Sequence, residues 1–98
     1  MTARALVVAT IRFTDKGRYD RYAAAFGPVF AHSGGAMLAA DESPQPFDGS
    51  GDGVDKIVVM RFDSENAARE FLNSPEYLHI SKDRDAGAEV RSWIVKAF

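Results

Sequence analysis

Residues 56–62, Lys-Ile-Val-Val-Met-Arg-Phe, give the clearest β-strand signal in the chain, and residues 5–13, Ala-Leu-Val-Val-Ala-Thr-Ile-Arg-Phe, give a second. Both stretches are rich in β-branched residues and are too short for a typical helix. Successive strand residues point to opposite faces of a sheet, and here both faces receive apolar side chains. A sheet with one face in water would alternate between apolar and polar residues. These strands therefore predict a sheet that is covered on both faces.

Two helical segments lie between the predicted strands. The first follows Thr14-Asp15, whose side chains can cap first-turn amides, and carries one apolar stripe: Tyr19, Tyr22, Phe26, Val29 and Phe30. We expect it to kink or break at Gly27-Pro28, because proline lacks an amide donor and clashes with the preceding turn. The second segment begins at Ser64. It restarts at Ser74-Pro75, where serine suits the N-cap and proline the first helical position, and continues to about Glu89.

Residues 36–42 and 90–98 supply the remaining two strands, so the element order is β-α-β-β-α-β. This order is typical of the α+β ferredoxin-like fold, in which a four-stranded antiparallel sheet has its helices on one face. Residues 43–53, with two prolines and three glycines, form a polar loop. The 98 residues provide for one domain, residues 1–98, with one hydrophobic core.

The helices can cover only one face of this sheet. We expect that face to carry Ile11, Phe13, Met60 and Phe62, and the other to carry Leu6, Val8, Ile57, Val59 and Ile94. Leaving the second set in water would cost about 25 cal/mol per Å² and promote aggregation. Face-to-face pairing of two sheets about a two-fold axis covers it, so we expect a homodimer. The alternative is that the 43–53 loop folds over this face, although Phe47 is its only large apolar residue.

The composition excludes several classes of protein. A hydrophobic fraction of 46% with 27% charged residues is ordinary for a globular domain, and the net charge of −2 argues against nucleic-acid binding. The absence of cysteine excludes disulfides, a thiolate zinc site and a cysteine nucleophile. No stretch approaches the roughly 18 apolar residues that cross a bilayer. We therefore expect a cytoplasmic protein with neither a membrane nor a nucleic acid as partner.

Tyr77 and Arg84 are the first candidates for a functional site. They are seven residues apart, nearly two helical turns, and share one helix face with Ile80 and Ser81. A phenol and a guanidinium that converge on one cavity can bind a carboxylate or stabilise an enolate. The structural alternative is that Tyr77 packs in the core while Arg84 pairs with a nearby carboxylate such as Asp83.

Thr10, Arg12 and Arg61 form a second candidate site, for an anionic ligand. We take the first and third strands to be adjacent and parallel, which places Arg12 and Arg61 near the same end and on the same face. With Thr10 they would then line the mouth of the dimer cavity. The alternative is that they are solvent-exposed rim charges or pair with the partner subunit.

His32 and His79 are the only side chains that titrate near neutral pH without perturbation. His32 lies at the end of the first helix, where a positive charge interacts favourably with the helix dipole. The two histidines lack the spacing of metal ligands, so we expect no metal site, although Asp41-Glu42 offer carboxylates. The chain contains no glycine-rich phosphate loop and no nucleophile elbow.

Several motifs together resemble one family. They are Thr14-Asp15 after the first strand, Tyr19 and Tyr22, Gly34-Gly35, Val58-Val59-Met60-Arg61-Phe62, Ala67-Ala68, Asn73-Ser74-Pro75-Glu76-Tyr77, Arg84 and Trp93-Ile94-Val95. In these the chain is similar, over nearly its whole length, to domain-of-unknown-function family 1330 of the dimeric α-β barrel superfamily. The resemblance implies the same fold and a sheet-to-sheet dimer, and it implies no particular reaction.

Two functions from different classes remain open. The first is a dimer that binds a small organic anion without turnover, with no cofactor. The second is a cofactor-independent enzyme, similar to the monooxygenases and isomerases of the superfamily, that acts on a small aromatic or keto-acid substrate. In the enzyme, Tyr77 or Arg84 would stabilise an anion, and Asp41 or His32 would handle the proton.

Overall fold

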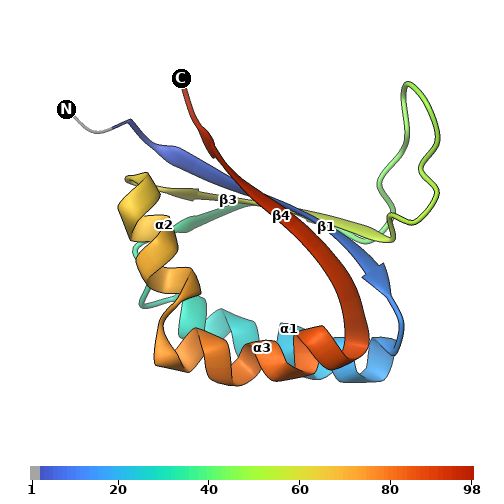
Figure 1. The fold of residues 1–98 in the computed structure, drawn as a ribbon, viewed down its shortest axis with the longest axis horizontal. Coiled ribbons are helices and arrows are strands. Elements are labelled where there is room, and N and C mark those ends of the chain that lie inside the picture. The colour runs from blue at the N-terminus through green and yellow to red at the C-terminus, as the bar shows by residue number, and fades with distance from the viewer. Residues whose placement is uncertain (1–2) are drawn as a thin grey trace.

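The computed structural model describes residues 3–98 of the chain. Along the chain it has β1 (Ala5–Phe13), α1 (Lys16–Phe30), β2 (Ala36–Asp41), β3 (Lys56–Phe62), α2 (Glu65–Leu72), α3 (Pro75–Gly87) and β4 (Ala88–Lys96). The strands form one sheet in the order β2-β3-β1-β4, and the three helices lie on one face of it (Figure 1). The predicted ferredoxin-like α+β fold is therefore confirmed.

Local sequence signals account for most of the element boundaries. The strands at residues 5–13 and 56–62 are as predicted. The predicted caps at Asp15 and Ser74 also form, because their side chains accept the amides of residues 18 and 77 at 3.2 and 3.3 Å. The Ser64 side chain caps the next helix in the same way and accepts the amide of residue 67 at 3.0 Å. The third helix ends at Gly87 rather than Glu89, so β4 begins two residues earlier than predicted.

The predicted break at Gly27-Pro28 does not occur, because α1 continues to Phe30. Pro28 lies in the last turn of the helix, where few hydrogen bonds remain to be lost. The carbonyl that loses its partner belongs to Ala24, which is exposed and can bind water instead.

The direction of the strands corrects one expectation. Every neighbouring pair of strands is antiparallel, including β1 and β3, in which Leu6 lies opposite Arg61 and Thr10 opposite Ile57. The prediction that β1 and β3 are parallel is therefore wrong. A helical crossover joins parallel strands, and in this order each crossover, β1 to β2 and β3 to β4, spans an intervening strand that runs the other way.

The register of β4 corrects a second expectation. Val7 lies opposite Ile94, so Ile94 faces the helices, and Val8 lies opposite Trp93. The face away from the helices, here called the open face, carries the apolar residues Leu6, Val8, Ile57, Val59, Trp93 and Val95. Trp93 and Val95 are 45% and 41% exposed. The residues of β4 are apolar on both faces, so the hydrophobic pattern did not fix which set points inward.

The loop between β2 and β3 does not cover the open face. It extends beyond the sheet on the side away from the helices (Figure 1), and Phe47 within it is 97% exposed. The open face of the single chain is therefore accessible. Within residues 3–98 no helix combines the length and the apolarity that a membrane span requires.

The hydrophobic core lies between the sheet and the helices, and Tyr19, Phe62 and Val7 are its largest fully buried side chains. Gly87, at the end of α3, fixes the position of α1 against this core. The Gly87 carbonyl accepts the amides of Thr14 and Asp15 at 2.9 and 3.0 Å, so the end of α3 lies against the start of α1. This contact holds the Tyr19 ring beside Phe13, at the end of β1, and Lys56, at the start of β3.

Candidate functional site

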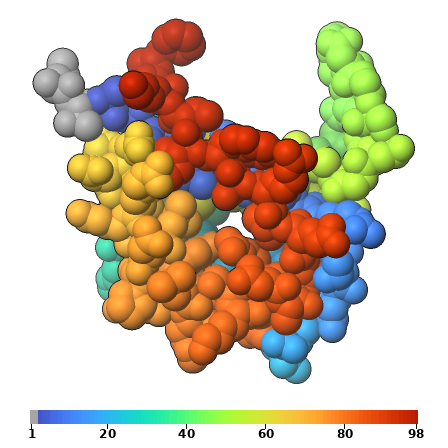
Figure 2. Space-filling model, in the orientation of Figure 1, coloured from blue at the N-terminus to red at the C-terminus, as the bar shows by residue number. Residues whose placement is uncertain are grey.

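A cavity of about 220 Å³ lies between the sheet and helices α1 and α3. Figure 2 shows the molecule hollowed between β4 and α3. Small side chains leave part of this space empty, because Ala9 of β1, Ala23 of α1 and Ala40 of β2 all line it. The rest of the lining is mostly apolar or aromatic and includes Val7, Ile11, Phe26, Val58, Met60 and Val90.

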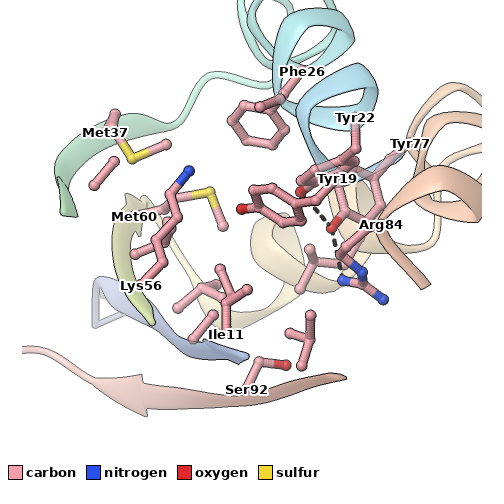
Figure 3. Close-up of a pocket in the computed structure, with 17 residues that line it drawn as sticks. Ile11, Tyr19, Tyr22, Phe26, Met37, Lys56, Met60, Tyr77, Arg84 and Ser92 are labelled. Carbon is pink, nitrogen blue, oxygen red and sulfur yellow. Dashed lines mark hydrogen bonds between the residues drawn. The ribbon is translucent and has the colours of Figure 1, made fainter. Parts of the chain in front are cut away.

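A hydrogen-bonded chain of polar groups borders this cavity. The hydroxyls of Tyr22, from α1, and Tyr77, from α3, lie 3.0 Å apart, and Arg84 Nη1 donates to the Tyr77 hydroxyl at 2.9 Å (Figure 3). The structure thus brings Tyr77 and Arg84 together and adds Tyr22 to them. The two hydroxyl groups carry two hydrogens in total, and the hydrogen bond between them uses one of these. One hydroxyl hydrogen of this pair therefore remains to donate to a further acceptor.

Arg84 is held as a cation at one end of the chain of groups. Its Nε and Nη2 lie 3.0 and 2.9 Å from Asp85 Oδ1. Burial lowers the pKa of Arg84, but the Tyr77 hydroxyl and Asp85 outweigh burial, and the net pKa is raised. Arg84 thus pairs with a nearby carboxylate, as the structural alternative expected, but the partner is Asp85. Asp83, the example named there, accepts from Arg18 Nε at 2.9 Å.

Tyr19 and Tyr22 are held in the neutral form. Burial raises the pKa of Tyr19 to about 12, and burial together with Tyr77 raises the pKa of Tyr22 well above its ordinary value. At neutral pH both side chains are therefore phenols that can donate a hydrogen bond, while Arg84 carries the charge.

Lys56 supplies a second positive charge to the cavity. It is the first residue of β3, and its side chain is only 12% exposed. Its Nζ lies 4.9 Å from the centre of the Tyr19 ring and 3.8 Å from Glu42 Oε2. Figure 3 shows Tyr19 between Lys56 on one side and Arg84 on the other.

The proposed grouping of Thr10, Arg12 and Arg61 is not formed. Since β1 and β3 are antiparallel, Arg61 lies opposite Leu6 at one end of the sheet, whereas Arg12 lies at the other end. Arg12 Nη1 pairs with Glu89 Oε2 at 3.0 Å on the exposed surface. The expectation of one anion site at a shared end of the open face is therefore wrong.

His32 and Asp41 do not reach Tyr77 and Arg84. His32 is exposed beyond the end of α1, and Asp41 lies on the open face, where its Oδ1 accepts the amide of Ser43 at 2.7 Å. Neither lines the cavity, which corrects the expectation that one of them handles a proton there. Within residues 3–98 the cavity lining contains no carboxylate and no imidazole, and no three potential ligands group around a metal position.

Sequence reasoning treated Tyr19 and Tyr22 as core residues and did not consider Lys56. A signal for each existed. A tyrosine in a buried stripe needs a partner for its hydroxyl, which marks Tyr22. Lys56 has the same strand parity as Val58 and Met60, so it is a charged side chain on the buried face.

Comparison with known proteins places this arrangement in a common fold. A protein of unknown function from Rhodopseudomonas palustris superposes with a TM-score of 0.82 at 20% identity, covering 100% of this chain and 85% of its own. A cofactor-independent oxygenase from Streptomyces nogalater superposes with a TM-score of 0.73 at 12% identity, and the match covers 99% of this chain and 95% of the oxygenase. A dimeric ferredoxin-like protein of unknown function from Thermobifida fusca superposes with a TM-score of 0.70 at 14% identity, and the match covers 99% of this chain and 93% of that protein.

At such identities these likenesses establish the fold alone. A search of the curated proteins gave no match. The model of one family, described as "Domain of unknown function (DUF1330)", matches residues 4–98. The match spans nearly the whole chain, and the chain therefore belongs to the DUF1330 family.

Proposed function

We propose that the cavity binds a small organic acid with an apolar, aromatic body, and that Tyr22, Tyr77 and Arg84 receive its acidic group. One observation carries this proposal: the hydroxyl pair keeps one hydrogen to donate, next to an apolar cavity and in contact with a fixed cation. Such a donor matches an anionic oxygen, because hydrogen bonds to charged groups are stronger than those between neutral groups.

The size of the cavity supports a compact ligand. A cavity of about 150 Å³ with an apolar lining holds benzene. The cavity here is about 220 Å³, which leaves room for a ring and a carboxylate. The walls suit a flat ring, since the rings of Tyr19, Tyr22 and Phe26 follow one another at centroid distances of 5.4 and 5.7 Å.

The second candidate function is a cofactor-independent enzyme that acts on a small aromatic keto acid. The same donors favour it, since a tyrosine hydroxyl linked to an arginine would stabilise an enolate oxygen. Enolisation also needs a base, and the described lining offers neither a carboxylate nor an imidazole. For this reason we rank binding first. Tyr22→Phe tests the alternative: if it leaves the keto–enol exchange of phenylpyruvate unchanged in an ultraviolet assay, the enzyme proposal fails.

Calorimetric titration with benzoate tests the binding proposal. Benzoate should bind, whereas benzyl alcohol should bind much more weakly. Arg84→Gln and Tyr22→Phe should each weaken benzoate binding by about tenfold or more, because a hydrogen bond to a charged group contributes about 1.5–3 kcal/mol. Arg69→Gln is the matched control, since Arg69 lies on α2 and pairs with Glu65 on the surface. Binding that is absent, or that is equal for Arg84→Gln and Arg69→Gln, refutes the proposal.

We also propose that two chains pair through their open faces. The apolar open face, with Trp93 and Val95 exposed, supports this, as does the structural likeness to a dimeric ferredoxin-like protein. Light scattering after gel filtration should give twice the chain mass of 10.7 kDa. Val8→Lys, at the centre of the open face, should give the monomer mass. Leu78→Lys, on the exposed side of α3, is the control and should keep the mass of the dimer. A wild-type monomer refutes the pairing.

A further inference from the structure

The ammonium group of Lys56 has unused hydrogen-bonding capacity. Lys56 Nζ carries three donors, yet it makes no hydrogen bond to any residue in the described range 3–98. Its separation from Glu42, 3.8 Å, is the longest among the ion pairs of these residues. Glu42 is also shared, since its other carboxylate oxygen lies 3.3 Å from Lys16 Nζ.

Lys56 and Arg84 line two different regions of the same cavity. The cavity is lined by residues of both edge strands, Met37 and Ala40 of β2 and Val90 and Ser92 of β4, so it extends across the sheet. Lys56 approaches it from the β3 floor and Arg84 from α3, with the Tyr19 ring between them (Figure 3).

The carboxylates near these two cations lie on the outer surface. Glu42 and Asp85 have side chains that are 44% and 65% exposed, so water screens their charges. Neither carboxylate lines the cavity. A ligand inside the cavity therefore meets two positive charges, and no lining residue of the described chain carries a negative charge.

We infer that the preferred ligand is a compact diacid, with one carboxylate on the Tyr22–Tyr77–Arg84 chain of groups and the other on Lys56. This inference rests on the proposed function and adds the ligand class. A single carboxylate uses one donor group and leaves Lys56 unsatisfied. A second carboxylate on the same ring pairs with Lys56 in a partly dry environment, where a charge-assisted hydrogen bond is strong.

Matched ligands test this inference. Isophthalate and 3-carbamoylbenzoate have nearly the same shape, and only isophthalate carries a second charge. Terephthalate and 4-carbamoylbenzoate repeat the comparison at a second spacing. In the wild-type protein at least one diacid should bind about tenfold or more tightly than its amide, consistent with one additional charged hydrogen bond. Benzoate serves as the reference ligand for the Arg84 end.

Variants of Lys56 assign the preference to this residue. Lys56→Met keeps most of the aliphatic length of the side chain and removes its charge, so it should reduce the diacid-to-amide ratio to about one and weaken diacid binding far more than benzoate binding; Lys56→Gln repeats the test if the methionine variant does not fold. Lys82→Met, on the exposed surface of α3, should retain the ratio. A ratio near one for both wild-type pairs, or a ratio that survives in both folded Lys56 variants, overturns the inference. If benzoate fails to bind, the proposed function itself fails.

Discussion

Gly87→Ala should destabilise the protein and disturb the tyrosine wall of the cavity. A β-carbon at residue 87 would lie 2.6 Å from the carbonyl oxygen of Asp15 and closer still to the amide nitrogen of Tyr19. Both are backbone atoms, so no side-chain rotation can relieve the overlap. The start of α1 would have to move away from the end of α3, and the two amide hydrogen bonds to the Gly87 carbonyl would lengthen.

The expected loss follows from these contacts. Overpacking of a well-packed site costs about 1–3 kcal/mol, and the upper part of that range applies because the backbone must shift. Each weakened hydrogen bond adds to the loss, at most about 0.5–1.5 kcal/mol. We therefore expect a loss of about 3 kcal/mol in the free energy of unfolding. For a domain of this size about 4–8 °C correspond to each kcal/mol, so Tm should fall by about 12–24 °C.

Circular dichroism melts and urea titrations at one fixed protein concentration measure this loss. Gly27→Ala is the matched control, because a β-carbon at residue 27 would meet no atom within 4 Å. Alanine in a helix interior is favoured over glycine by about 1 kcal/mol, so this control should be neutral or stabilising. A Gly87→Ala protein that melts within about 4 °C of the wild type would refute the packing argument. If the variant folds, benzoate affinity should also fall, since Tyr19 moves.

Three further predictions follow from the electrostatics and the open face. Because burial raises the pKa of Tyr19 to about 12, Tyr19 should contribute stability that is complete below pH about 10 and declines as the pH rises towards 12. Absorbance at the phenolate band should follow this titration, and ionisation of Tyr19 near pH 10 would contradict it. Trp93 is the only tryptophan, so dilution that separates the dimer should shift its emission to the red; an emission maximum that is independent of concentration argues against burial of Trp93 between subunits. Arg12→Ala should change the free energy of unfolding by less than about 1 kcal/mol and leave benzoate affinity intact, because its pair with Glu89 is exposed, whereas a tenfold loss in a calorimetric titration would restore Arg12 to the site.

Sequence reasoning predicted the fold where local chemistry decides it. The runs of β-branched residues in β1 and β3 and the caps at Asp15 and Ser74 each depend on a few neighbouring residues. The phase of β4 depends on packing against β1, since Trp93 and Ile94 are both apolar and either could face the core. Strand direction is likewise a property of the whole sheet. Because β1 and β3 were predicted to be parallel, Arg12 and Arg61 were predicted at the same end of the sheet, whereas they lie at opposite ends.

The candidate site was predictable only within one helix. Tyr77 and Arg84 share a face of α3, so their spacing alone brings them together. Tyr22 and Lys56 line the same cavity from α1 and β3, and their placement there depends on how the helices lie over the sheet. Periodicity reports that a side chain points inward, but it does not show whether the space there is filled or empty. Three alanines from three elements leave this space, and no one of them signals a cavity.

The cavity floor and the open face are the two sides of a single layer of backbone. Along β1, Val7, Ala9 and Ile11 line the cavity, while the residues between them point to the opposite side. Ligand selection and subunit pairing can therefore change independently, one residue apart, by substitution. An insertion of one residue in β1 would instead exchange both sets of side chains at once. β1 should thus tolerate substitutions far better than insertions or deletions.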